Sequence, residues 1–370
     1  MIQTVLLGDV INIRSGKSRP KLTGDYPVYG GNGIFGSAPT SNISGPAIII
    51  GRVGAYCGSI HKEKKDFWLS DNALGVTAKE VADLDYLYYL LGFINLNHQA
   101  VGGAQPLLTQ GIINNISICL PDLETQNKIA NILDSLNEKI ELNRKMNETL
   151  EQMGQLLFRH YFVDNVEVDG WEKKALGDIL DLRGGLSYKA HFLSDDITDM
   201  PMVTMGCVSG KFRINIDAIK RYNGEYSEHH ILNTGDIFIA TRDVTQDRVL
   251  IGSPAIVPKI LGKAICATNL YKVVLKQDIS TEFLYQLMRT KRYREQIIAN
   301  AKGSTIVMLT KDSVLNYTFS VDFDSDTYSK YVKVAEVIRQ KIDKNSEVIQ
   351  TLTILRDTLL PRLMNGKIKL

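Results

Sequence analysis

The 370-residue chain repeats one plan twice, and this repetition constrains its fold more than any other feature. The segment LGDVINIR at 7–14 returns as LGDILDLR at 176–183, and YLYYL at 86–90 returns as FLYQL at 283–287. Because such landmarks keep their order in both halves, the sequence predicts two copies of one structural unit. Each copy takes up about half of the chain.

In each copy the residue composition and the apolar pattern change about midway. Residues 1–120 are rich in glycine and carry short apolar runs at 47–50, 73–77 and 116–120, which are typical of strands. From 124 to 162 there is no proline and a single glycine, and apolar residues recur at alternating steps of four and three. This spacing indicates a long helix with a coiled-coil seam, and the pattern returns 202 residues later.

The seam of one helix needs a partner, and the second copy provides one. Two copies related by a pseudo-twofold axis would make the helices antiparallel. The predicted seam residues are Ile129, Leu133, Leu136, Ile140, Asn143 and Leu150 in the first helix, and Ile338, Ile342, Asn345, Ile349, Leu352 and Leu359 in the second.

Asn143 and Asn345 occupy equivalent seam positions. One alternative is that both are buried, where a polar residue costs stability but fixes register and orientation. The other is that the helices roll and both side chains face solvent.

The sequence therefore predicts two α/β (α+β) domains, pseudo-repeated and separated by two long antiparallel coiled-coil helices. The expected domains are 1–121 and 163–323. The expected helical segments are 122–162 and 324–370, the latter including a C-terminal tail.

Motifs for catalysis and cofactor binding are weak. Gly31 to Gly36 satisfies GxGxxG, but two prolines follow where a dinucleotide-binding helix should begin, so we interpret it as a glycine-rich turn. No GxxxxGK[ST] motif occurs, and the His229–His230 pair lacks metal-ligand spacing. The four cysteines form no CxxC pair, which favours a reducing cytoplasm over a disulfide scaffold. We expect no metal site and no catalytic residues in this chain.

The polar loops, in contrast, suit DNA. The chain has 43 Lys+Arg against 41 Asp+Glu, so local clusters rather than net charge must provide phosphate contacts. Residues 289–294 form one such cluster, and Arg52 and Arg242 each follow a strand-like run, where a guanidinium can read guanine. The predicted DNA-binding residues are Arg14, Lys17, Arg19, Lys21, Asn32, Arg52, Lys62, Lys64, Lys65, Gln105, Lys189, Arg242, Arg248, Lys302, Ser304 and Thr305.

The order of these features resembles the specificity (S) subunits of type I restriction–modification systems. The resemblance covers nearly the whole chain and is carried by five segments. They are LGD at 7–9, YPVYGGNG at 26–33, LPDLETQ at 120–126, LLFRHYFV at 156–163 before a second LGD at 176–178, and LRDTLLPRLMNG at 355–366.

The resemblance implies two target-recognition domains, each reading one half of a split, asymmetric site in double-stranded DNA. The helices would set the spacing and bind two methyltransferase (M) subunits, and restriction (R) subunits would join that complex. S-adenosylmethionine, ATP and Mg²⁺ would belong to those partners, and the chain itself would be non-catalytic, cytoplasmic and without a membrane partner. The alternatives are a stand-alone or fused DNA methyltransferase and a coiled-coil assembly scaffold.

Overall fold

The computed structural model describes residues 3–103, 105–165, 170–210, 212, 214–243, 247–303, 307–368 and 370. It divides into two compact units. The first unit comprises Met1–Glu141 and Gln350–Leu370, and the second comprises Leu142–Ile349. Each unit thus holds a globular part and a stretch of both long helices, whereas the sequence suggested boundaries that set the helices apart.

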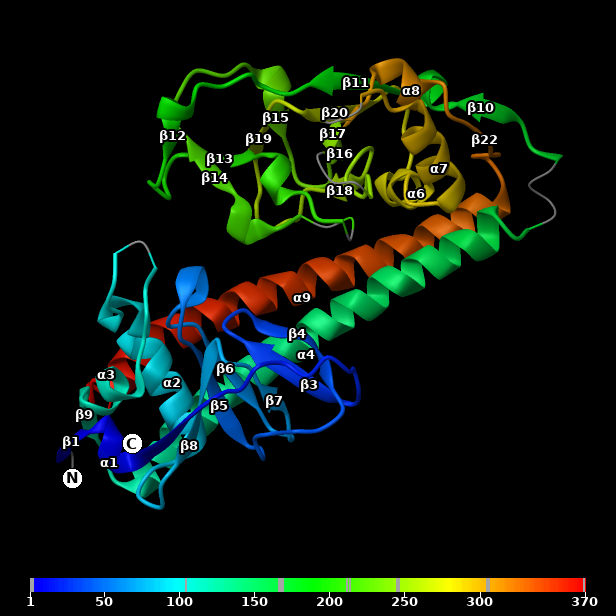
Figure 1. Ribbon diagram of the computed structural model, residues 1–370. Coiled ribbons are helices and arrows are strands. Elements are labelled where there is room, and N and C mark those ends of the chain that lie inside the picture. Colours follow the sequence, from blue (N-terminus) through cyan, green and yellow to red (C-terminus); the bar gives the residue numbers. More distant parts are fainter. Residues whose placement is uncertain are drawn as a thin grey trace. The chain divides into compact units, whose positions relative to one another are not determined.

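In the first unit the main antiparallel sheet has the strand order β2-β8-β5-β6, and a smaller sheet has the order β4-β3-β7 (Figure 1). A further pair joins β1 to β9, so the start of the unit meets the strand that precedes the long helix. The strands are β1 (Gln3–Leu6), β2 (Ile11–Ser15), β3 (Tyr26–Gly30), β4 (Gly33–Ala38), β5 (Ala47–Gly51), β6 (Ile60–Glu63), β7 (Trp68–Leu69), β8 (Ala73–Ala78) and β9 (Ser117–Leu120). The helices are α1 (Leu7–Val10), η1 (Gly54–Tyr56), α2 (Leu84–Ile94), η2 (Leu96–Gln99), α3 (Gln110–Asn114) and α4 (Leu123–Phe162), whose C-terminal part belongs to the second unit.

The second unit repeats this topology. Its main sheet has the order β11-β20-β16-β18, and β14-β13-β19 corresponds to β4-β3-β7, with β12 and β15 added at the edges. Its strands are β10 (Lys173–Ala175), β11 (Leu180–Gly184), β12 (Leu193–Ser194), β13 (Met200–Val203), β14 (Lys220–Tyr222), β15 (Ile231–Leu232), β16 (Ile237–Ala240), β17 (Arg242–Asp243), β18 (Pro254–Ile256), β19 (Ala264–Cys266), β20 (Leu270–Leu275), β21 (Val307–Met308) and β22 (Thr318–Ser320). Its helices include α5 (Leu176–Ile179), α6 (Thr281–Leu287), α7 (Lys291–Asn300), α8 (Lys311–Leu315) and α9 (Asp326–Met364), whose C-terminal part belongs to the first unit. The predicted pseudo-repeat of mixed helices and sheets is confirmed.

The repeated LGD motif forms the same local structure in both units. Leu7 and Leu176 are fully buried, and their N–H groups donate to the carbonyls of Ile116 and Tyr317, each over 2.9 Å. The carboxylate that ends the motif turns back to accept the backbone N–H three residues earlier, as Asp178 does from Ala175 over 2.7 Å. The motif is therefore a corner, anchored by its buried leucine, that leads into the main sheet.

The long helix α4 begins at Leu123, within one residue of the predicted helical segment 122–162. The Asp122 side chain accepts hydrogen bonds from the backbone and hydroxyl of Thr125, and these hold the pKa of Asp122 well below its ordinary value. The buried Gln126 donates to the carbonyls of Val81 and Pro121 and accepts the Asp83 N–H over 2.8 Å. It thereby ties the first turn of α4 to the start of α2.

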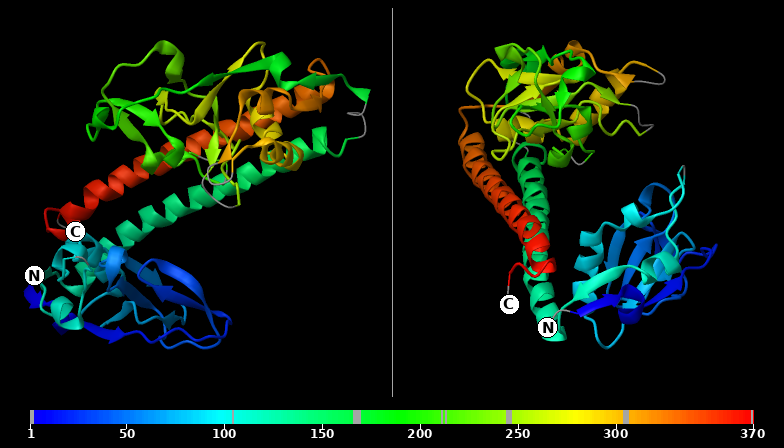
Figure 2. Two further views of the ribbon diagram at one scale, coloured as in Figure 1. Left: turned by 45° about the horizontal axis from the view of Figure 1, so that its top comes forward. Right: turned by 90° about the vertical axis from the view of Figure 1, so that its left-hand side faces the viewer.

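In each unit a stretch of α4 lies beside a stretch of α9 (Figure 2). In the second unit Asn147 bonds Ser346, and the Phe162 ring lies 5.0 Å from that of Tyr331. Residue numbers rise by 15 along α4 while they fall by 15 along α9, so the helices are antiparallel. Asn143 and Asn345 are both buried, which decides between the two alternatives for these seam positions.

The remaining predicted seam residues are also buried or half-buried. Ile129 and Leu133 join a core in the first unit that includes Leu363 from the end of α9. In the second unit, Phe158 and Phe162 of α4 pack with Phe283 of α6 and Tyr331 of α9. The helices are thus part of the hydrophobic core of each unit.

Candidate nucleic-acid interface

In the first unit, backbone pairing brings together loops that are distant in sequence. Lys17 N donates to Leu69 O over 3.0 Å, and a Cβ atom on Gly16 would lie 1.9 Å from Ser70 O, so only glycine permits this approach. Arg52 N donates to Asn72 O over 3.1 Å, on the same connection between β7 and β8. The loop after β2 and the end of β5 therefore share one neighbour.

A third loop joins them. Leu108 N donates to Arg52 O over 2.8 Å, and Gly54 N donates to Pro106 O over 3.1 Å, which places the segment of Gln105 beside the end of β5. The Arg52 Nε atom is buried without a hydrogen-bond partner among the described residues. We call the surface formed by residues 16–22, 31–36, 52–59, 70–72, 101–103 and 105–107 the first reader face.

The glycine-rich motif at 31–36 begins in a hairpin turn at this face and continues into β4. Asn32 lies in the turn between β3 and β4, and the turn is held because Ser59 Oγ and His61 Nε2 both contact Gly31 O, the latter at 3.2 Å. A strand rather than a helix follows the glycines, so the dinucleotide fingerprint is absent and the interpretation as a turn is confirmed.

The predicted lysine cluster at 62–65 is partly neutralised by ion pairs within the unit. The Lys62 amino group lies 2.8 Å from Asp85 and 3.5 Å from Asp134, so its charge is paired inside the unit. Burial acts to lower the pKa of Lys62, but these two carboxylates raise it above its ordinary value overall. Lys64 and Lys65 are exposed, with their backbone N–H groups held by Glu63. The assignment of Lys62 to DNA remains a prediction, and a DNA contact would have to break these pairs.

The second unit brings equivalent loops together with different side chains. Leu186 N donates to Cys266 O over 2.8 Å, Thr241 N donates to Asn269 O, and Leu309 N donates to Thr241 O, the latter two over 2.9 Å. These bonds match those of Lys17, Arg52 and Leu108, so Thr241 is the equivalent of Arg52. Arg242 corresponds to Val53, one position further along the chain, although the sequence suggested similar places for the two arginines.

We call the surface formed by residues 186–192, 241–243, 247–253, 268–269, 302–303 and 307–308 the second reader face. Arg242 pairs with Met308 across β17 and β21, and Lys302 forms an isolated bridge with the same residue. Lys189 is exposed, whereas Arg248 is half-buried with Nη1 3.5 Å from Ile298 O. Ser304 and Thr305 lie outside the described residues. Of the remaining candidates in the first unit, Arg14, Lys17, Arg19, Lys21, Asn32 and Gln105 are exposed.

A loop of the second reader face is held from both sides, and the sequence did not indicate this. The buried Asp243 carboxylate accepts the N–H groups of Leu250 over 2.6 Å and Ile251 over 3.2 Å. Arg294 of α7 donates to the carbonyls of Arg248, Val249 and Ile251. The resulting Asp243–Arg294 clamp fixes the backbone between Arg248 and Ile251.

The expected phosphate-binding cluster at 289–294 is wrong in part. Arg289 is buried, and its Nη1 atom lies 2.5 Å from Glu151 of α4, while Arg294 belongs to the clamp. Lys291 and Arg292 remain exposed. A tertiary partner 138 residues away decides the environment of Arg289, and the sequence gives no sign of it.

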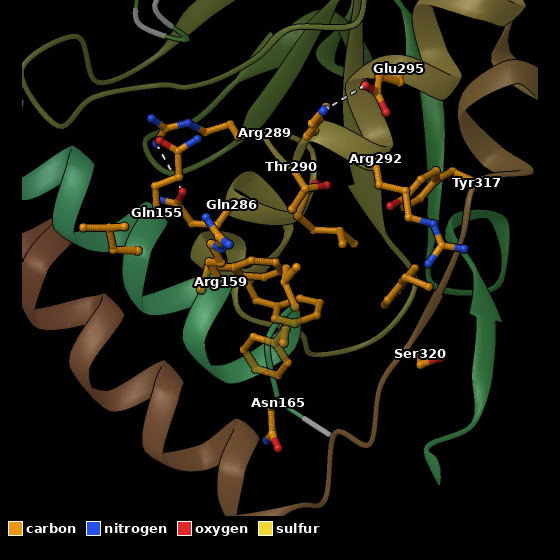
Figure 3. A pocket seen from close by; sticks show the side chains of 18 residues that line it. Gln155, Arg159, Asn165, Gln286, Arg289, Thr290, Arg292, Glu295, Tyr317 and Ser320 are labelled. Atoms are coloured by element: carbon orange, nitrogen blue, oxygen red, sulfur yellow. Dashed lines mark hydrogen bonds and ion pairs between the residues drawn. The ribbon is translucent and has the colours of Figure 1, made fainter. Parts of the chain in front are cut away.

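A cavity of about 780 Å³ lies between α4 and the α6–α7 region of the second unit (Figure 3). Phe158, Phe162 and Phe283 contribute apolar surface, and Arg159 and Arg292 lie among its polar lining. Arg159 pairs with Asp164 at 2.9 Å, and this pair weakens the attraction of Arg159 for an anionic ligand. The lining of the cavity therefore combines packed aromatic rings with arginine side chains, one of which is paired.

Among the described residues, no group of three or more His, Cys, Asp or Glu side chains could hold a metal ion. The four cysteines are free, with Cys119 exposed and the others buried. None of the described helices has both the length and the apolar character that a membrane crossing requires.

Comparisons with known proteins agree with this architecture. The chain is 32% identical over 139 residues to the EcoprrI specificity subunit of Escherichia coli, an alignment that covers 35% of each chain. It is 26% identical over 316 residues to the MjaIX specificity subunit of Methanocaldococcus jannaschii, covering 77% of this chain and 69% of that one. The first of these relatives is therefore matched over only about a third of its length.

The crystal structure of a type I restriction–modification S subunit from M. genitalium shares the fold, with a TM-score of 0.65 at 17% identity over 98% of this chain and 96% of that one. The family described as the type I restriction modification DNA specificity domain matches residues 2–152 and again residues 168–321. Because the family matches most of the chain, and does so twice, the chain belongs to the type I restriction–modification DNA specificity family.

Proposed function

We propose that this chain selects the DNA sequence for a type I restriction–modification complex, with each reader face contacting one half of a split site. One observation carries the proposal. Two units of the same topology bring equivalent loops together through matching backbone bonds, while the side chains that these loops present differ. Thr241 of the second unit occupies the position equivalent to Arg52 of the first, so the two half-sites should differ in sequence.

The chain acts in this proposal without catalysis of its own. Methyl transfer and cleavage belong to methyltransferase and restriction subunits, which bring S-adenosylmethionine, ATP and Mg²⁺. Support comes from the reader faces, whose side chains suit phosphate and base contacts rather than a reaction. The continuous helix α4 contributes to both units and would act as the spacer between the half-sites.

A second apolar stripe on α4 supports a docking role for the helices. Leu142, Met146, Met153 and Leu156 are exposed, and at 3.6 residues per turn they fall within about 80° of the helix circumference. The seam residues that face α9 lie on a different side, centred about 125° away. Exposed apolar stripes of this kind mark protein interfaces, and we assign this one to a methyltransferase subunit.

The reading role is tested by replacing one arginine on each reader face in the complex reconstituted with its methyltransferase subunits. Arg52→Ala and Arg242→Ala should each weaken DNA binding by about 1–3 kcal/mol, chiefly at one half-site. Binding is measured on duplexes in which the first or the second half-site is scrambled. Lys173→Ala, an exposed cation outside both faces, serves as the control. An equal loss on specific and random DNA would show phosphate contact instead of base reading.

Mapping methylated bases across a genome, with the chain present and absent, then tests the function as a whole. A split, asymmetric motif that disappears with the chain is the expected result. Methyl transfer by the purified chain alone would overturn the proposal in favour of a methyltransferase. Binding that shows no sequence preference would favour an assembly scaffold.

The docking role is tested on the exposed stripe. Leu156→Asp should lower affinity for the methyltransferase subunit by at least about tenfold, because it places a charge in an apolar contact. Gln155→Asp introduces the same charge one residue away on an exposed position and should have little effect. Equal co-purification of both variants with the methyltransferase subunit would place its binding site elsewhere.

A further inference from the structure

The small sheet of the first unit carries a β-bulge that exposes two apolar residues in succession. Tyr29 pairs with Ile34 and Val28 pairs with Gly36, so Phe35 has no opposite residue on β3. Ile34 is 59% exposed and Phe35 is 49% exposed, although alternation along a regular strand would turn one of them inward. Bulges re-aim side chains in this way and are frequent beside functional sites.

Two glycines make room for this arrangement. A Cβ atom on Gly30 would lie 2.9 Å from Phe35 Cε1, so the ring rests on bare backbone. A Cβ atom on Gly36 would lie 2.7 Å from Arg19 Cζ, and the guanidinium lies 5.6 Å from the centre of the Phe35 ring. The exposed ring and the cation are therefore held as a pair, and Arg19 has no acidic partner within the described residues.

The surroundings indicate the chemistry of the partner. Lys17 and Lys21 are exposed on the loop that carries Arg19. Tyr56, 51% exposed, lies next to the turn, because a Cβ atom on Gly31 would be 3.3 Å from Tyr56 Cβ. The core of a protein interface is usually depleted in charged residues and especially in lysine. Apolar side chains set among cations are instead typical of proteins that press a wedge between stacked bases while arginine follows the groove.

We propose that Ile34 and Phe35 form an apolar wedge that enters the base stack in the half-site read by the first unit. Arg19 accompanies the wedge and contacts the adjacent phosphate backbone. This inference rests on the proposed function, and it adds that DNA distortion, besides hydrogen bonding to base edges, contributes to recognition of the first half-site. In the described part of the second unit, β13 pairs with β14 in a continuous register without such a bulge.

The test uses the complex reconstituted with its methyltransferase subunits and duplexes that carry 2-aminopurine at successive positions of the first half-site. Fluorescence should rise at one step on binding, because unstacking relieves quenching. Phe35→Ala should abolish that rise and weaken binding by at least about fivefold, the range found when a stacked aromatic ring is removed. Phe35→Leu keeps an apolar side chain of similar reach and should retain part of the signal.

Val81→Ala, a truncation at a residue 57% exposed in the same unit but outside the reader face, is the matched control and should behave as the wild type. Arg19→Ala should reduce the slope of log binding constant against log salt concentration by about one, because one counterion fewer is released.

A wild-type complex that binds its site without any fluorescence change overturns the wedge, as does a Phe35→Ala complex with the full signal. A Phe35→Ala variant that loses its methyltransferase subunit but not its DNA signal would show that the pair is a protein contact. Failure of the wild-type complex to prefer any sequence would refute the proposed function itself.

Discussion

In the first unit the Tyr89 hydroxyl lies 2.5 Å from Asp134 of α4, and Asn137 donates to the same hydroxyl over 2.8 Å. In the second unit the corresponding helix α6 meets α4 and α9 through ion pairs. Glu151 is bound by Arg289 at 2.5 Å and by Arg339 at 3.2 Å, and Arg339 also reaches Glu282 at 2.8 Å. One topology thus joins its globular part to the helices with two kinds of chemistry.

The ring of Tyr285 completes the network of the second unit. The two guanidinium groups lie against it, with Arg289 Cζ 4.8 Å and Arg339 Cζ 5.1 Å from its centre. Burial acts to lower the pKa of Arg339, but Glu282 and Glu151 raise it above its ordinary value. Each charge therefore depends on its partners, and the arrangement is less tolerant of change than the hydroxyl and amide contacts of the first unit.

At equivalent helix starts, different side chains accept the backbone N–H group. Gln126 accepts the N–H of Asp83 at the start of α2, and Tyr328 accepts the N–H of Ser280 at the start of α6, over 2.8 and 3.0 Å. The backbone geometry is common to both units, whereas the side chains that satisfy it are free to vary. Sequence divergence between the halves therefore reaches the attachment contacts as well as the reader faces.

The largest expected effect follows from breaking the ion pairs of the second unit. Glu151→Ala removes the carboxylate partner of the buried Arg289 and one of the two carboxylates that the half-buried Arg339 contacts, and should destabilise that unit by about 3–5 kcal/mol. Trp68 lies in the first unit and Trp171 in the second, and these are the two tryptophans of the chain. Unfolding in urea, followed by fluorescence in Trp68→Phe and Trp171→Phe backgrounds, reports each unit separately.

Asp134→Ala is the matched change in the first unit. It removes a partner of the Tyr89 hydroxyl and of Lys62, but the Asp134 carboxylate is half-buried and Lys62 keeps Asp85, so the loss should be closer to about 1–3 kcal/mol. Equal losses in the two units would contradict the contrast drawn between their attachments.

Much of this contrast lies beyond what the sequence predicts. Helix periodicity located α4 and α9 and marked Asn143 and Asn345 as seam residues, because a helix displays its buried face at a fixed spacing. The apolar runs at 47–50, 73–77 and 116–120 correspond to β5, β8 and β9 for a similar reason. Local patterns of this kind depend on neighbours in the chain and are visible without a fold.

The environment of single charged residues depends on tertiary pairing. Arg289 and Arg294 resemble surface cations in the sequence, yet one meets Glu151 and the other holds the loop after Arg242. The equivalence of Arg52 with Thr241 rests on backbone bonds from Leu108 and Leu309, and no alignment of side chains would indicate it. Candidate DNA contacts from sequence therefore identify the right loops more readily than the right side chains.

The Asp243–Arg294 clamp provides the next prediction, with an effect on binding rather than on folding. Arg294→Ala removes the donors for three loop carbonyls and should weaken binding at the second half-site by about 1–3 kcal/mol. Competition binding to duplexes with either half-site altered measures the effect. Lys173→Ala, an exposed cation of the same unit outside both reader faces, is the control. If Arg294 contacted phosphate instead, its loss would lower the salt dependence of binding on both half-sites.

The smallest effect concerns alkaline pH and compares the buried phenols of the two units. Burial is the first cause that raises the pKa of Tyr29, Tyr86 and Tyr89 in the first unit, to about 12 for Tyr86. It likewise raises the pKa of six tyrosines in the second unit, namely Tyr271, Tyr285, Tyr293, Tyr317, Tyr328 and Tyr331. A phenol with a raised pKa in the folded state keeps its proton there while the unfolded chain loses it near pH 10. Stability is therefore complete below pH 10 and falls as the pH rises, by about 1.4 kcal/mol per pH unit for each such phenol.

The second unit holds more of these phenols, so its stability should fall more steeply with pH than that of the first, measured by urea unfolding between about pH 10 and 11 with one tryptophan at a time. Tyr86→Phe tests the assignment without breaking a bond, because the Tyr86 hydroxyl is buried with no hydrogen-bond partner among the described residues. It should flatten the slope of the first unit and leave that of the second unchanged. Equal slopes in the two wild-type units would mean that the phenols of the second unit are hydrated in solution. The ion-pair network around Tyr285 would then be open to water, and the larger loss expected for Glu151→Ala would shrink with it.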